Sequence, residues 1–280
     1  MTERTDWTST PTRTIDAAGT QFAYRRLGPS HGVPLVLLNH WGANLDNFDP
    51  AIVDRLAEDR PVYALDYRGI GRSGGKAPVT VAGMAQDMIA AIRALGLNAI
   101  DLIGFSLGGF VAQQILLDTP DLVRRTILAG TGPAGGTGIA RVGAVSWPLI
   151  VKGLVTFTDP KTYMFFTASA NGRSAAKAFV DRLALRTTDR DTSVGIAALL
   201  RQQQAIKAWG QQSPQPLDTI RIPVLVANGD HDIIVPSENS RELARRIPGA
   251  EIVLYPDAGH GGIFQYHEAF AERAIMFLDA

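Results

Sequence analysis

One serine stands between glycines where a short apolar run gives way to a helical pattern. Ser106 is the centre of G-F-S-L-G, with Gly104 before it and Gly108 after it. The run 99–103 is typical of a buried strand, and residues 110–117 follow a helical pattern. So sharp a turn forces a strained backbone at the serine, which then projects its hydroxyl beside helix N-terminal N–H groups. The pattern therefore predicts a nucleophile, against the alternative of a glycine-rich turn with a surface serine.

A serine hydroxyl needs a neighbouring base at neutral pH, and the sequence offers histidines for this role. His260 lies among glycines in A-G-H-G-G, directly after the last predicted strand. In a parallel sheet that loop opens on the same edge as Ser106, so His260 is predicted to be the base. His31 lies in a predicted surface turn and His267 on the final predicted helix, and both are expected to be solvated.

An imidazole base needs a carboxylate that fixes its tautomer and stabilises its charged form. The loop after the predicted strand 223–228 reads G-D-H-D and contains Asp230 and Asp232. Asp232 lies further into the loop and is predicted to reach His260, whereas Asp230 is expected to shape the turn and remains the alternative. His231 is expected at the rim. The order serine, aspartate, histidine suits this arrangement, with the groups on three successive loops of one sheet edge.

An oxyanion hole needs two N–H donors aimed at the developing charge. The backbone N–H of Leu107, directly after the nucleophile, is one candidate, and that of Trp41, in the loop after the first buried strand, is the other. The neighbouring His40 is expected to be a hydrogen-bonded structural residue. The Trp41 ring is a candidate for the acyl pocket, together with three further aromatic residues: Trp147, Phe157 and Phe166.

A repeated strand, loop and helix pattern must position these groups. Continuous apolar runs predict buried strands, and this alternation predicts an α/β fold, a mostly parallel central sheet with helices on both faces. Residues 1–14 are expected to form a loose arm. Strands are predicted at 15–17, 20–26, 35–39, 61–65, 99–103, 125–129, 223–228 and 251–255. Helices are predicted at 49–57, 80–95, 110–117, 174–186, 192–209 (ended by Gly210), 238–246 and 263–278.

The alternation stops after Gly130 and resumes near residue 223. Residues 131–137 are glycine-rich and typical of a hinge, and no convincing strand follows between 139 and 212. The pattern predicts an inserted helical cap at 134–215, between the core segments 1–133 and 216–280. A helical insertion at this place can cover a site at the strand ends, and a small domain without a role at the site is the alternative.

Composition restricts the possible functions. The 280 residues carry no net charge, which gives no electrostatic reason for binding nucleic acid or an anionic membrane. The chain has no cysteine, which excludes disulfides, thiolate zinc sites and a cysteine nucleophile. No apolar run has signal-peptide or membrane-spanning length, so a soluble cytoplasmic protein is expected.

Two further patterns could indicate a cofactor or a metal. Residues 69–74 fit G-x-G-x-x-G, but the next helix is predicted only from about residue 80, so no N-terminus points at a pyrophosphate. The His231 and Asp232 pair lacks a third ligand at helical spacing. We therefore expect neither a cofactor nor a metal.

Several of these pieces together resemble the α/β-hydrolase superfamily over nearly the whole chain. The sharp strand-to-helix turn around Ser106, called the elbow below, is similar to that of cofactor-free haloperoxidase-type esterases and related lidded carboxylesterases. Its serine differs from the aspartate of haloalkane dehalogenases and epoxide hydrolases, and Trp41 interrupts the usual His-Gly-x of the first loop. The matching pieces are H-W-G at 40–42, D-x-R-G-x-G-x-S at 66–73, G-F-S-L-G-G at 104–109, G-D-H-D-x-x-V-P at 229–236 and A-G-H at 258–260.

The sequence therefore predicts a serine hydrolase with a Ser106, His260 and Asp232 triad. Its expected substrate is a small to medium carboxylic ester, cleaved through an acyl-enzyme. The alternatives on the same triad are a lactonase, a perhydrolase or haloperoxidase-type enzyme, and a carbon–carbon bond hydrolase. A non-catalytic receptor for a small molecule is the alternative from another class. The sequence does not indicate an oligomeric state.

Overall fold

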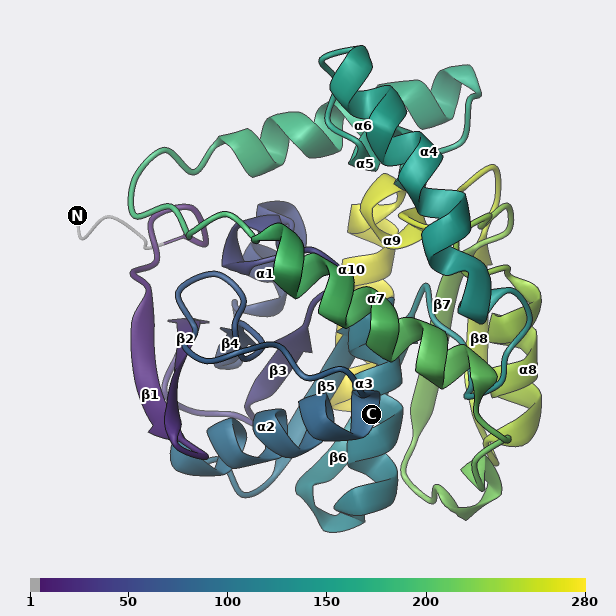
Figure 1. The fold of residues 1–280 in the computed structure, drawn as a ribbon. Helices are drawn as coiled ribbons and strands as arrows, with labels where there is room; N and C mark the ends of the chain where they lie inside the picture. The colour runs from purple at the N-terminus through teal and green to yellow at the C-terminus, as the bar shows by residue number, and fades with distance from the viewer. Residues whose placement is uncertain (1–5) are drawn as a thin grey trace.

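The computed structural model describes residues 6–280, whose strands form one eight-stranded sheet (Figure 1). The strands are β1 (Arg13–Ala17), β2 (Thr20–Leu27), β3 (Leu35–Leu38), β4 (Val62–Leu65), β5 (Ile100–Phe105), β6 (Val123–Ala129), β7 (Val224–Gly229) and β8 (Glu251–Tyr255). Their order in the sheet is β1-β2-β4-β3-β5-β6-β7-β8. β2 pairs antiparallel with β1 and β4, and every other pair is parallel. The predicted mostly parallel sheet is confirmed.

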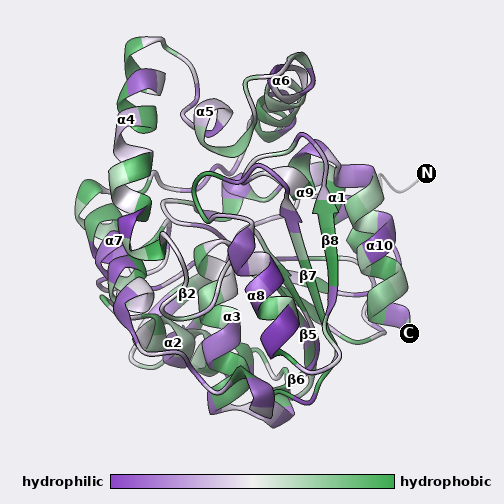
Figure 2. Cartoon of the chain, turned by 90° about the vertical axis from the view of Figure 1, so that its right-hand side faces the viewer, coloured by the Kyte–Doolittle hydropathy of each residue, from purple (hydrophilic) through white to green (hydrophobic). Residues whose placement is uncertain are grey.

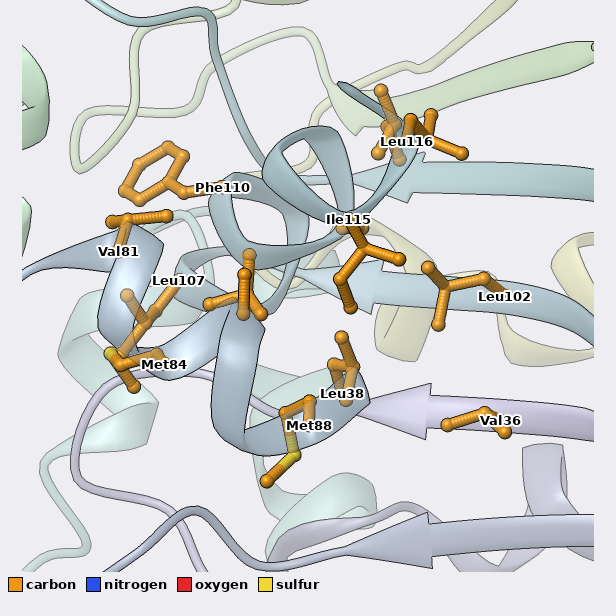
Figure 3. Close-up of a cluster of buried hydrophobic side chains, with 14 of the residues drawn as sticks. Val36, Leu38, Val81, Met84, Met88, Leu102, Leu107, Phe110, Ile115 and Leu116 are labelled. Carbon is orange, nitrogen blue, oxygen red and sulfur yellow. The ribbon is translucent and has the colours of Figure 1, made fainter. Parts of the chain in front are cut away.

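Helices cover both faces of this sheet. The helices of the core segments are α1 (Pro50–Leu56), α2 (Val81–Ala94), α3 (Leu107–Asp118), α8 (Glu238–Arg246), α9 (Gly262–Gln265) and α10 (His267–Asp279). In β3, Val36 and Leu38 belong to one hydrophobic cluster, which α2, α3 and α8 share, and Leu35 and Leu37 belong to another, which α1 and α10 share. Figure 3 shows part of the first cluster between α2, α3 and the strands. Side chains that alternate between two apolar layers explain the continuous apolar sequence of these strands.

The helix predicted at 263–278 is two helices, because the backbone leaves the helical conformation at Tyr266 (φ −111°, ψ 42°). α9 continues the loop that carries His260, and the Tyr266 ring stacks on Tyr255 of β8 at 5.2 Å between centroids. A Cβ on Gly262 would come within 2.6 Å of the Gly229 backbone nitrogen. The close approach of α9 to β7 fixes its direction, so the chain must turn before α10 begins.

The loose arm predicted for residues 1–14 is wrong for the part that the structure describes; residues 1–5 lie outside it. The Trp7 side chain is 1 % exposed and packs edge-on against Phe48. The Arg186 guanidinium donates hydrogen bonds to the backbone oxygens of Trp7 (3.1 Å) and Thr10 (2.9 Å). A buried indole removes a large apolar area from water, which anchors a segment whose polar composition suggested disorder.

The segment that interrupts the core, residues 134–215, is helical, and within residues 139–212 no strand occurs, as predicted. Its helices are α4 (Val142–Val155), α5 (Lys161–Phe165), α6 (Ala170–Ala184) and α7 (Ile196–Gln211). Figures 1 and 2, viewed from perpendicular directions, both place α4, α5 and α6 at the top of the molecule. Among residues 6–280, no helix combines the length and apolarity that a membrane crossing requires.

The prediction that Gly210 ends a helix is wrong, because α7 continues through it to Gln211. A Cβ at this position would collide with the backbone nitrogen of Ala140. The neighbouring Trp209 is buried and its ring stacks on Phe110 of α3, with 5.6 Å between centroids. Gly210 therefore permits close packing of α7 on the start of the inserted segment, and the absence of a side chain here does not mark a stop.

A buried carboxyl connects the sheet to the inserted segment. Asp66, directly after β4, is 2 % exposed, and its Oδ2 accepts no hydrogen bond from the described residues. A Cβ on Gly71 would lie within 2.5 Å of Asp191 Oδ2 and closer still to Asp66 Oδ2, so the two carboxyls are adjacent. Burial, and then the hydrogen bond with Asp191, raise the pKa of Asp66 well above its usual range. We infer that Asp66 in its protonated form donates to the adjacent Asp191 carboxylate, which gives the buried oxygen a partner.

This arrangement predicts a pH-dependent stability. Because the pKa of Asp66 is higher in the folded than in the unfolded chain, its contribution is complete below about pH 4 and is lost as the pH rises through the folded pKa. Asp66→Asn does not titrate and keeps an N–H donor for Asp191. We expect the Tm of Asp66→Asn minus that of the wild type to increase from pH 4 to pH 9, measured by thermal unfolding.

The exposed Asp218, changed to Asn, is the matched control and should show a Tm difference that does not vary with pH in this way. A difference for Asp66→Asn that stays constant over the same range would contradict the inferred proton on Asp66.

Candidate active site

Ser106 occupies the turn between β5 and α3 with φ 56° and ψ −117°. This combination is unfavourable for any residue with a Cβ, so the predicted backbone strain is confirmed. The flanking glycines allow the turn. A Cβ on Gly108 would collide with the carbonyl oxygen of Leu38 in β3, and one on Gly104 with that of Gly108. Strand and helix therefore meet more closely than any side chain would permit.

Several contacts hold the strained serine in place. Its backbone N–H donates to the carbonyl oxygen of Ala129 at the end of β6 (2.8 Å), and its own carbonyl oxygen accepts from Thr131 Oγ1 (2.9 Å). On the helix side, Leu107 and Phe110 are buried in the cluster of Figure 3. The sequence analysis did not identify Thr131, which carries no local signal of its contact with a residue in another loop.

A chain of hydrogen bonds joins the three residues predicted to carry the chemistry. Ser106 Oγ lies 2.9 Å from His260 Nε2, and His260 Nδ1 lies 2.7 Å from Asp232 Oδ2. Asp232 Oδ1 accepts from the backbone N–H groups of Ile234 (2.8 Å) and Val235 (3.0 Å). All three side chains are buried. The carboxylate requires a proton on Nδ1, which leaves Nε2 free to take the proton of the serine hydroxyl.

The loops that carry these residues follow β5, β7 and β8. The prediction of three successive loops is wrong in this detail, because β6 lies between β5 and β7 in the sheet. The loop after β8 crosses this gap: His260 lies five residues beyond the end of the strand at Tyr255 and reaches Ser106. Parallel strands still bring all three side chains to one edge of the sheet.

The other carboxylate and the remaining histidines of the sequence analysis lie elsewhere. Asp230 Oδ1 contacts His231 Nδ1 at 2.5 Å, and both residues are exposed. The hydrogen bond that Asp230 accepts from His231, followed by the negative charge of Asp230, raises the pKa of His231. His31 is exposed in a turn, and His267 is half-buried at the start of α10. Only His260 among these histidines is bonded to Ser106.

Of the two candidate oxyanion donors, Leu107 directly follows Ser106 and Trp41 lines the same cavity as Ser106. Within residues 6–280, the backbone N–H groups of Trp41 and Leu107 donate to no protein acceptor. The loop that carries Trp41 is held by α7: Trp41 Nε1 donates to the Leu199 carbonyl oxygen (2.8 Å), and the Gly42 N–H donates to Gln202 Oε1 (2.9 Å). The buried Gln202 was not predicted, because its contact depends on how the inserted segment folds back.

His40 lies beside the same loop. Its Nδ1 is 2.9 Å from the carbonyl oxygen of Trp41, and its ring packs edge-on against Phe105 and Phe165. Burial, aided by the positive charge of Lys161, lowers the pKa of His40 to about 3. The imidazole is therefore neutral at physiological pH.

A small cavity of about 10 Å³ adjoins Ser106 and His260, which is about the space that one water molecule requires. Residues of the core and of the inserted segment line it together, and none of them is an aspartate, glutamate, lysine or arginine. The lining residues are His40, Trp41, Ser106, Phe110, Val142, Met164, Phe165, Ile206, Ile234, Val235 and His260.

The structure brings only the Trp41 ring, among the aromatic candidates for the pocket, to this cavity. Trp147 packs edge-on against the Trp41 ring from outside, with 5.8 Å between centroids. Phe157 is 99 % exposed at the end of α4, and Phe166 packs on Phe179 of α6. The sequence analysis missed the walls contributed by Met164 and Phe165, since helical periodicity does not show which face of a short helix turns toward the serine.

Comparisons with known proteins identify the family of this chain. Residues 33–265 match the family model described as alpha/beta hydrolase fold. A poly(3-hydroxyalkanoate) depolymerase from Ectopseudomonas oleovorans is 31 % identical over 90 % of this chain and 87 % of its own. A pimeloyl-[acyl-carrier protein] methyl ester esterase from Neisseria meningitidis is 30 % identical over 91 % and 96 %. An alpha/beta hydrolase fold protein from Chitinophaga pinensis matches with a TM-score of 0.93 and 37 % identity, over 99 % and 100 %.

The strained turn makes a prediction about stability. Ser106→Gly and Ser106→Ala both remove the hydroxyl and its hydrogen bond, but only glycine adopts φ 56° without strain. We expect the free energy of unfolding of the glycine variant to exceed that of the alanine variant by about 1 kcal/mol. Chemical denaturation of both proteins measures the difference. A glycine variant that is less stable than the alanine variant by about 0.4–1 kcal/mol, the unfolded-state entropy cost of glycine alone, would show that the turn stores no strain.

Proposed function

Since the chain belongs to the α/β-hydrolase fold family, we propose that it is a serine hydrolase that cleaves carboxylic esters of modest size through an acyl-enzyme. The observation that carries the proposal is the buried hydrogen-bond chain from Ser106 through His260 to Asp232. A hydroxyl at a strained turn, bonded to an imidazole nitrogen, has the two features that an activated nucleophile needs.

In the proposed reaction, Ser106 Oγ attacks the ester carbonyl carbon while His260 Nε2 takes the hydroxyl proton. The tetrahedral intermediate collapses, the bond to the leaving oxygen breaks, and His260 returns the proton to the departing alcohol. Water then attacks the acyl-enzyme with His260 again as the base, which releases the acid and restores Ser106. Asp232 keeps the proton on Nδ1 and stabilises the imidazolium that forms at each step.

The backbone N–H groups of Leu107 and Trp41 are the proposed donors to the oxyanion. Both are free of protein acceptors among the described residues; Leu107 directly follows the serine, and Trp41 lines the same cavity. The α7 contacts with Trp41 and Gly42 support this role, because they fix the loop before any substrate arrives. A preorganised donor stabilises the developing charge without the cost of reorientation.

The character of the cavity supports an uncharged ester. Its lining contains no aspartate, glutamate, lysine or arginine. A charged acyl group would therefore lose its hydration on entering and find no side chain of opposite charge. The relatives include enzymes whose names refer to a methyl ester and to a polyester, which is consistent with this bond type.

We also propose that residues 134–215 are a cap on a core formed by 1–133 and 216–280. Val142, Met164 and Ile206 of this segment line the cavity together with Ser106. Because the cavity has room for about one water molecule, an acyl chain enters it only if these side chains move aside. The cap therefore controls both the entry of substrate to Ser106 and the length of acyl chain that the cavity accepts.

Replacement of the nucleophile tests the reaction. Ser106→Ala should lower kcat/KM for p-nitrophenyl butyrate by about a million-fold, because the loss of the nucleophile removes the covalent step. Wild-type protein should also be labelled by a fluorophosphonate probe, detected by mass spectrometry as an adduct on Ser106. Retained turnover in Ser106→Ala would contradict the assignment of the nucleophile, and a wild type that neither labels nor turns over ester would favour the small-molecule receptor.

The cap proposal predicts a change in chain-length preference. Met164→Ala removes the flexible end of a side chain that lines the cavity and opens space beside the acyl group. We expect the kcat/KM ratio of hexanoate to acetate p-nitrophenyl esters to rise about tenfold, on the scale of roughly 0.8 kcal/mol for each methylene buried. Leu154→Ala, on an exposed face of α4, is the matched control and should leave the ratio unchanged. An unchanged ratio in Met164→Ala would show that this cap residue does not contact the acyl chain, and would contradict the cap proposal.

A further inference from the structure

One polar atom beside the reacting serine is not used by the proposed mechanism. His40 is 7 % exposed and lines the same cavity as Ser106 and His260. Its Nε2 is buried and has no hydrogen-bond partner among residues 6–280. An unpaired polar atom in an apolar surrounding costs about 1–3 kcal/mol, so its retention needs an explanation.

The other ring nitrogen determines what this atom can bind. His40 Nδ1 lies 2.9 Å from the Trp41 carbonyl oxygen, which can only accept, so Nδ1 must carry the proton. In the neutral ring Nε2 is then a bare acceptor. Burial keeps the pKa of His40 near 3, and the ring stays in this form throughout the neutral and alkaline range. The fold therefore presents a fixed lone pair rather than a proton.

The residues that line the cavity supply no donor for this lone pair, and the Lys161 ammonium, whose charge acts on His40, forms no hydrogen bond with it. The other polar side chains that line the cavity are those of Ser106 and His260, which are bonded to each other, and Trp41, whose Nε1–H donates to Leu199. The remaining lining residues are apolar, and the rings of Phe105 and Phe165 enclose the imidazole edge-on. Since His40 lines the cavity, a molecule that enters it is the candidate for the missing partner.

We infer that His40 Nε2 is a specificity determinant, which accepts a hydrogen bond from a hydroxyl group carried by the acyl chain close to the ester carbonyl. This inference rests on the proposed ester hydrolysis at Ser106, since it assigns the acyl group to the same cavity. The preferred substrate class is then an ester of a 2- or 3-hydroxy acid rather than of a plain fatty acid. A site built to pair a hydroxyl rejects an analogue without one, because its buried acceptor is left unpaired.

The first experiment uses the wild-type enzyme and matched p-nitrophenyl esters. The 2- and 3-hydroxybutyrate esters are compared with the 2- and 3-fluorobutyrate esters and with butyrate; fluorine occupies a similar place but donates no hydrogen bond. We expect kcat/KM for at least one hydroxy ester to exceed that of its fluoro counterpart by about tenfold. Correction for spontaneous hydrolysis of each ester removes differences in intrinsic reactivity.

The second experiment changes the acceptor. His40→Asn retains an amide N–H near the position of Nδ1, which can still donate to the Trp41 oxygen, but it has no atom at the position of Nε2. The hydroxy-to-fluoro ratio should fall to about one in this variant, while His40→Gln, whose side chain reaches the position of Nε2, should restore part of it. His267→Asn, at the half-buried start of α10, is the matched control and should keep the wild-type ratio.

The outcomes separate the inference from the function on which it rests. A wild-type enzyme that hydrolyses the esters with no preference for either hydroxy acid overturns the inference and leaves the serine hydrolase intact. An equal loss on all esters in His40→Asn, with the ratio preserved, also overturns it and indicates that His40 supports the Trp41 loop without contacting the acyl group. Absence of turnover on every ester, together with no fluorophosphonate adduct, overturns the proposed function and the inference together.

Discussion

The close contact between β5 and α3 is the constraint on which the site depends. Gly104 and Gly108 allow the strand to turn into the helix within a few residues, and any Cβ at either place would collide with backbone carbonyl oxygens. The turn forces Ser106 into a strained conformation, which hydrogen bonds to Ala129 and Thr131 maintain. The strain is therefore balanced by packing in the interior of the sheet, where it cannot relax without breaking the hydrophobic layer beneath α3.

Hydrogen bonds and ion pairs that involve buried carboxylates hold the inserted segment to the core. The guanidinium of Arg182 in α6 binds both carboxylate oxygens of Asp49, at 2.8 and 2.6 Å, and Asp49 also caps α1. The loop before α7 places Asp191 against Asp66 and near the buried pair of Arg25 and Asp46. Buried charges are costly unless they are paired, so these contacts favour one orientation of the segment. A fixed orientation is what a wall of a small cavity requires.

The cavity combines a reactive hydrogen-bond chain with apolar walls. Low polarity strengthens the interaction between His260 and Asp232 and at the same time penalises every polar atom left without a partner. The side-chain polar atoms of Ser106, His260 and Asp232 have hydrogen-bond partners within the protein. The Nε2 lone pair of His40 has none among the described residues, and the inference about hydroxy acids is based on it. The proposed catalysis and the inferred selectivity thus depend on the same property of the surroundings, their low polarity.

The sequence determined the sheet, the elbow and which residue types could react, because each depends on local rules. Apolar runs mark buried strands, glycines mark the sharp turn at Ser106, and parallel strands bring their loops to one edge. Only the tertiary structure decided the walls of the cavity, the support from Gln202, the packing role of Gly210 and the burial of Trp7. These depend on contacts between segments far apart along the chain, and the periodicity of a helix does not encode which neighbour it meets.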